Sequence, residues 1–157
     1  YKGRTNKKRI KVDNIPEILK AEHKEFIESI ISKEVDLKAV MWNSFHRITL
    51  VNKVENERLT LDFDLTFRWD NKTEKFDNLI IAELKQESVN RNSAFFALMK
   101  TINIRPYRLS KYCIGSIELY GGSRLKFNRF KKKLLTLKKN KHQCCLISYF
   151  LSPNLML

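Results

Sequence analysis

The feature that most constrains the fold is residues 58–69, RLTLDFDLTFRW, where polar and apolar side chains alternate without interruption. Alternation with a period of two is typical of a β-strand that buries one face. We expect the apolar side chains, from Leu59 to Trp69, to form one face under helices. The opposite face carries both signs of charge, and its charged members are Arg58, Asp62, Asp64 and Arg68. We interpret the two acids as neutralising the two arginines rather than as binding a metal.

The remaining patterns predict an α+β fold with several strands and flanking helices. Helices are expected over residues 16–32, 93–101 and 124–139. Strands are expected over residues 45–51, 58–69, 79–85 and 113–120. Asn14 is the expected N-cap of the first helix, and Ser93 or a preceding asparagine that of the second.

Composition limits the classes of function. A chain of 157 residues with 43% hydrophobic residues can fold as one domain, and its net charge of +14 favours polyanionic partners. Three cysteines without CxxC spacing and three scattered histidines indicate reduced thiols in a cytoplasmic protein without a zinc site. The apolar stretch at residues 144–157 is too short to span a bilayer, and we interpret residues 141–157 as a tail that packs on the core.

Residues 79–85, LIIAELK, are apolar except for Glu83 and Lys85. Such a strand is usually central, where a carboxylate and an ammonium need partners other than bulk water. Each charged face taken singly is compatible with simple solvation. Taken together they favour a closed sheet lined by arginine and lysine for phosphates and by glutamate for a divalent metal.

Several segments in this order resemble one family. The segments are KGRTNKKR, FHRITLV followed by ERLTLD, IAELKQE, and SKYCIG followed by NRFK, and they extend from Lys2 to Lys131. They resemble the bacterial polyphosphate polymerase branch of the vacuolar transporter chaperone (VTC) domain, a member of the triphosphate tunnel metalloenzyme (CYTH-like) superfamily. The resemblance covers residues 1–140. It implies an antiparallel β-tunnel whose first strands would precede Tyr1.

The resemblance also implies an activity and a set of site residues. ATP would transfer its γ-phosphate to a growing polyphosphate chain, with Mn²⁺ or Mg²⁺ as cofactor and without a specific nucleic-acid partner. The implied metal ligand is Glu83. The implied phosphate-binding residues are Arg4, Lys8, Arg9, Arg47, Arg58, Lys85, Ser110 and Lys111. Of these, Arg47, Lys85 and Lys111 would take part in catalysis together with Glu83.

Three alternatives remain open at this point. A triphosphatase of the same fold would use the same electrostatic site, with water in place of the phosphate chain. A non-catalytic domain could bind polyphosphate only. A basic nucleic-acid-binding module is supported by the net charge, but the sequence has no helix-turn-helix, zinc spacing or RRM-type aromatic signature.

Overall fold

The structure is a computed structural model that describes residues 7–14, 16, 18–34, 36–107, 109–121, 125–139 and 146–151. The chain divides into two compact units, Tyr1–Val40 and Met41–Leu157. Among the residues that the structure describes in the first unit, Ala21–Ile31 form the helix α1. We expected this helix to begin near Pro16 with Asn14 as N-cap, and that expectation was wrong. The helix begins later because the backbone N–H of Lys20 donates to the Nδ1 atom of His23 at 3.2 Å, which caps the first turn.

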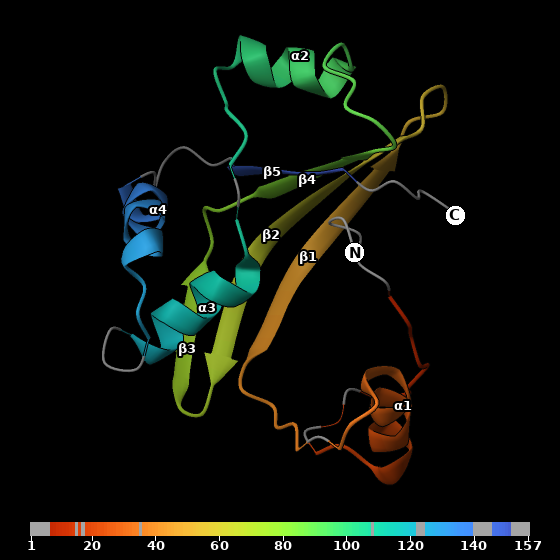
Figure 1. Ribbon diagram of the computed structural model, residues 1–157. Coiled ribbons are helices and arrows are strands. Elements are labelled where there is room, and N and C mark those ends of the chain that lie inside the picture. The colour runs from red at the N-terminus through yellow and green to blue at the C-terminus, as the bar shows by residue number, and fades with distance from the viewer. Residues whose placement is uncertain are drawn as a thin grey trace. The chain divides into compact units, whose positions relative to one another are not determined.

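The second unit is built on a mostly antiparallel sheet (Figure 1). Its strands are β1 (Trp42–Val51), β2 (Glu57–Trp69), β3 (Lys72–Phe76), β4 (Ile81–Gln86) and β5 (Leu146–Leu151). The order is β1-β2-β4-β5, with β3 pairing the last third of β2. The neighbours β1–β2, β2–β3 and β2–β4 are antiparallel, whereas β5 joins β4 in parallel. The α+β class is confirmed for an open sheet, and the closed tunnel stays a prediction.

The long strand β2 contains a bulge that the alternating sequence does not reveal. Asn43 and Arg47 lie on the same face of β1, but their partners on β2, Phe67 and Asp62, are five positions apart instead of four. The extra residue lies at Asp64, whose φ of 53° is left-handed, a conformation that aspartate tolerates better than most residues. Phe67 and Asp62 therefore share a face of the sheet, since the bulge exchanges the two faces of β2.

This exchange corrects the expectation of one continuous apolar face. One core cluster is built from Leu65 and Phe67, together with residues of α3 (Lys111–Tyr120) and α4 (Asn128–Lys139). A second cluster has Leu59 and Leu61 packed against Ala82 of β4 and residues of α2 (Ala94–Thr101). Residues before and after the bulge thus bury their apolar side chains on opposite faces of the sheet.

Residues 113–120 were predicted as a strand, and that prediction was wrong, because they form most of α3. The backbone N–H of Cys113 donates to the Ser110 side chain at 3.3 Å, which caps the helix. Ile114 and Ile117, three positions apart, are buried in the first core cluster. Figure 1 shows α3 lying across β2 and β3. The three-residue spacing of Ile114 and Ile117 is typical of a helix that buries one side, and not of a strand.

The other predicted elements are confirmed with small shifts in their bounds. Ser93 caps α2 by accepting the N–H of Phe96 at 3.4 Å. The strand β3 was not predicted, because its five residues, KTEKF, are mostly polar and follow a turn at Asp70. None of the helices in the described ranges combines the length and the hydrophobicity that a bilayer-spanning helix needs.

Candidate functional site

Charged side chains from three neighbouring strands share one face of the sheet. Residues that lie opposite each other in a sheet point to the same side. Arg47 of β1 lies opposite Asp62 of β2. On the other side of β2, Arg58 lies opposite Lys85 of β4. Between them Thr60 lies opposite Glu83. We call the face formed by Arg47, Arg58, Thr60, Asp62, Glu83 and Lys85 the polar face.

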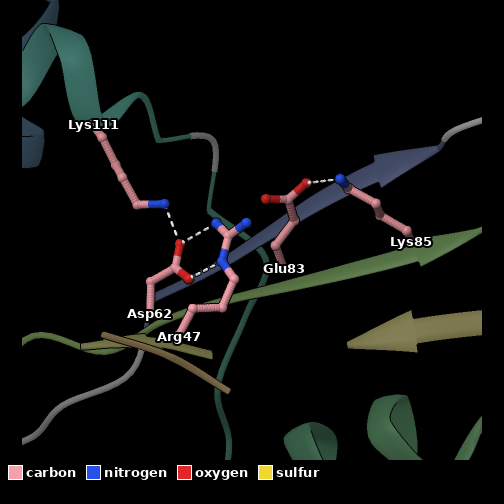
Figure 2. Close-up of polar contacts among 5 residues, drawn as sticks. All are labelled: Arg47, Asp62, Glu83, Lys85 and Lys111. Atoms are coloured by element: carbon pink, nitrogen blue, oxygen red, sulfur yellow. Dashed lines mark hydrogen bonds and ion pairs between the residues drawn. The ribbon is translucent and has the colours of Figure 1, made fainter. Parts of the chain in front are cut away.

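Asp62 is the centre of this face (Figure 2). Its side chain is 0% exposed, and it accepts two hydrogen bonds from Arg47, Nε to Oδ1 at 2.6 Å and Nη2 to Oδ2 at 2.7 Å. The ammonium of Lys111, at the first position of α3, also donates to Oδ2. One buried carboxylate therefore joins β1, β2 and the N-terminal end of α3. Such a carboxylate is stable in the interior only because it is paired and hydrogen-bonded.

The pKa values of this cluster follow from the same contacts. Burial of Asp62 acts to raise the pKa of its carboxyl, but the hydrogen bonds from Arg47 and Lys111 outweigh burial and lower it below the ordinary 3.8. The hydrogen bond to Asp62 raises the pKa of the Arg47 guanidinium, against the opposing effect of burial, and the charge of Glu83 adds to the increase. Asp62 is consequently ionised at neutral pH.

Both cations that bind Asp62 also contact the ring of Phe45. The guanidinium carbon of Arg47 lies 5.1 Å from the ring centroid, and the Nζ atom of Lys111 lies 4.3 Å from it. These distances are within the range of cation–π attraction. The ring and the carboxylate together hold the two cationic groups next to each other.

Glu83 and Lys85 form a second ion pair on the polar face. The Oε1 atom of Glu83 lies 3.2 Å from the Nζ atom of Lys85, and their side chains are 19% and 23% exposed. Figure 2 shows the Glu83 carboxylate between Arg47 and Lys85. Arg47, Glu83 and Lys85 thus lie on one face, and Lys111 of α3 binds Asp62 on the same face. The catalytic roles that the resemblance implies for these four residues stay predictions.

Arg58 lies on the polar face, and two polar atoms there have no hydrogen-bond partner within the described ranges. They are the Nε atom of Arg58 and the Oγ1 atom of Thr60, both buried. Arg68, which we expected on the same face as Arg58, is exposed on the opposite face because of the bulge. Asp64 pairs with His46 at 3.0 Å, so Asp62 and Asp64 bind Arg47, Lys111 and His46 rather than Arg58 and Arg68.

Four further residues were predicted to bind phosphate. Ser110 is the cap of α3, and its side chain accepts from the Cys113 backbone beside Lys111. Lys8 and Arg9 are exposed residues of the first unit. Arg4 lies outside the described residues. The roles predicted for these four residues stay predictions.

A divalent metal fits this face only in part. In the described portion of the chain, no three His, Cys, Asp or Glu residues lie close enough to hold a metal ion together. Asp62 is occupied by Arg47 and Lys111, which leaves Glu83 as the carboxylate at the surface of the face. One carboxylate suits an ion such as Mg²⁺ that takes its remaining ligands from phosphates and water, but not a site made by the protein alone.

Sequence reasoning missed the importance of Asp62. Its position in RLTLDFDLTFRW is equivalent to that of Asp64, and both are single acids between apolar residues. Nothing local separates a fully buried aspartate from one that is half exposed. The separating signal is tertiary, since Lys111 is 49 positions away in the sequence.

Comparison with known proteins gives one match. The family model of the VTC domain matches residues 2–120. Neither the curated proteins nor the solved structures gave a match. Because the matched region contains β1 to β4 and α3, it includes every residue of the polar face and Lys111. The match covers more than half of the chain, so the protein belongs to the VTC domain family, which is associated with polyphosphate metabolism.

Proposed function

We propose that the polar face binds a phosphate chain and that the protein is a polyphosphate polymerase-like phosphotransferase, which transfers the γ-phosphate of ATP to polyphosphate. The observation that carries the proposal is the gathering of Arg47, Arg58, Lys85 and Lys111 around two carboxylates. Family membership supports a phosphate chain as the anionic ligand.

The charge balance of the face supports an anionic ligand. The four cations are accompanied by Asp62 and Glu83, so two positive charges are left over on a surface that is partly withdrawn from water. Arginine donates two parallel hydrogen bonds to phosphate, while lysine acts as a point charge, and the face offers both. The unpartnered Nε atom of Arg58 and hydroxyl of Thr60 are further groups that phosphate oxygens or water would satisfy.

The reaction requires little covalent chemistry from the protein. The bond between the γ-phosphorus of ATP and its bridging oxygen to the β-phosphate breaks, and ADP leaves with that electron pair. A new bond forms between the γ-phosphorus and a terminal oxygen of the polyphosphate chain. Arg47, Lys85 and Lys111 would orient the two anionic reactants and offset their mutual repulsion.

Glu83 is the residue that would hold a divalent metal, because it is the accessible carboxylate of the face. A Mn²⁺ or Mg²⁺ ion bound together with the phosphates would neutralise charge on the transferred group. Lys85, which pairs with Glu83 at 3.2 Å, would then become available to the phosphate oxygens. The polar face thus supplies cations for binding and one carboxylate for the metal.

The test is to incubate the complete protein with ATP and Mn²⁺ and to measure polyphosphate and ADP. We expect both products. We also expect Glu83→Gln to lower the rate at least about tenfold, because Glu83 would hold the metal that neutralises charge on the transferred group. Binding of preformed polyphosphate should persist in Glu83→Gln, since the four cations remain. The control is Glu87→Gln, which removes the same charge from an exposed position one residue after β4.

The outcomes separate the alternatives. Release of inorganic phosphate without polyphosphate would replace the polymerase by a triphosphatase. Polyphosphate binding without any product would leave a non-catalytic binder. A wild-type protein that neither binds polyphosphate nor uses ATP would overturn the proposal, as would equal rates for the Glu83→Gln and wild-type proteins.

A further inference from the structure

We propose that Asp62 is a positioning residue that holds Arg47 and Lys111 in the orientation in which they bind a phosphate chain. This inference rests on the proposed function and deepens it. Asp62 itself would not touch the ligand, because its side chain is 0% exposed and its two oxygens are occupied by the two cations. It would act on the ligand only through those cations.

The geometry of Arg47 fits such a role. Its Nε and Nη2 atoms point to Asp62, at 2.6 and 2.7 Å, so one edge of the guanidinium is fixed. The Nη1 atom makes no hydrogen bond to a described residue, and the side chain is 41% exposed. A guanidinium held by one edge keeps donors of its other edge for a second oxyanion. The ligand would therefore meet an arginine whose direction is already set.

Lys111 is held in a comparable way. Its ammonium has three donors, of which one is directed to Asp62, and its Nζ atom lies 4.3 Å from the Phe45 ring centroid. It is also the first residue of α3, so its contact with Asp62 fixes this end of the helix to β2. Asp62 thus controls the position of a helix end as well as that of a side chain.

Fixing these cations matters because free arginine and lysine side chains populate many rotamers. Ordering them when the ligand arrives reduces affinity, whereas ordering them during folding does not. Lysine and arginine that converge on one spot also repel each other. The Asp62 carboxylate between them offsets that repulsion, so the two cationic groups stay close together before the ligand binds.

A positioning role for Asp62 predicts the opposite change in polyphosphate binding from the change that charge alone predicts. If Asp62 were only an acidic neighbour, Asp62→Asn would remove a negative charge and would strengthen polyphosphate binding. If it positions the cations, Asp62→Asn weakens binding although the protein becomes more positive. We expect the Kd for polyphosphate to rise about tenfold or more at a salt concentration near 0.15 M, where distant charges are largely screened.

The chain offers a matched control in Asp64→Asn. Asp64 lies on the same strand two positions away, and its side chain is 53% exposed and paired with His46. The substitution makes the same change in charge, and asparagine tolerates the left-handed φ of 53° found at this position. We expect Asp64→Asn to change the Kd by less than about twofold, because an exposed pair is weak.

A double-mutant cycle with Arg47→Met separates positioning from general instability. If Asp62 acts through Arg47, adding Asp62→Asn to Arg47→Met should weaken binding much less than it does in the wild-type background. Circular dichroism and thermal unfolding identify a variant that fails to fold. Asp62→Glu then provides a second variant, because it keeps the charge but moves the carboxylate by one methylene group. We expect weaker binding for it as well.

The results distinguish this inference from the proposed function. If wild-type protein does not bind polyphosphate, both fail together. If the wild type binds but folded Asp62→Asn binds as tightly or more tightly, or if Asp62→Glu binds normally, the positioning role fails and the proposed function stands. Equal effects of Asp62→Asn in the wild-type and Arg47→Met backgrounds would also overturn it.

Discussion

Replacing Gly115 by alanine tests how closely α3 approaches the sheet. A Cβ atom at this position would lie 2.3 Å from the Cδ1 atom of Phe67 and 2.6 Å from the Sδ atom of Met41. Carbon atoms in contact are normally about 3.5–4.0 Å apart, so the ring or the helix would have to move by more than about 1 Å. Phe67 is 1% exposed and packs edge-on against Phe76, so the ring has little room to move.

The size of the effect can be estimated from two opposing terms. Overpacking a dense core costs about 1–3 kcal/mol, and the distances at Gly115 favour the upper part of that range. Alanine in place of glycine inside a helix stabilises the helix by about 1 kcal/mol. We therefore expect the free energy of unfolding to fall by about 1–2 kcal/mol, which corresponds to a decrease in Tm of about 2–8 °C for a chain of this size.

Thermal and urea unfolding followed by circular dichroism measure this change. The control is Tyr112→Ala on the same helix, where the residue is 60% exposed and helix propensity dominates. A second substitution, Phe67→Leu, should relieve part of the clash, so the double variant should lose less stability than the sum of the single variants. An increase in Tm for Gly115→Ala, as helix propensity alone would produce, would refute the packing described for α3.

Two further predictions concern buried polar groups of the polar face. Because the pKa of Asp62 is lowered in the folded protein, its ionised form stabilises the fold at pH values above the ordinary 3.8, and that contribution disappears as the pH falls through the lower folded-state value. Acid unfolding should therefore be less steep in folded Asp62→Asn than in Asp64→Asn. Thr60→Val removes a buried hydroxyl without a described partner, so we expect stability unchanged or raised by up to about 1 kcal/mol in urea titrations, and a loss of more than about 1 kcal/mol would indicate a hydrogen bond at that hydroxyl.

The secondary structure of the sheet could be predicted largely from local sequence. The segments 45–51, 58–69 and 79–85 contain β-branched and aromatic residues or strict alternation, and each became a strand with bounds shifted by up to three residues. The family resemblance was likewise carried by local segments and is confirmed by the match over residues 2–120. Local sequence failed for α3, because the β-branched Ile114 and Ile117 and the terminal Tyr120 favour a strand. Only the cap at Ser110 and the helical spacing of Ile114 and Ile117 indicate a helix there.

The sequence by itself determined that residues 58–69 form a strand. It also determined that two further strand segments, residues 45–51 and 79–85, carry arginine, lysine and glutamate side chains. Tertiary structure decided which face each part of that strand presents, because the bulge at Asp64 depends on pairing with β1. It also decided that Asp62, rather than Asp64, is buried between Arg47 and Lys111. The physical reason is that alternation records only the local direction of side chains, whereas register and charge pairing depend on contacts between residues far apart in the chain.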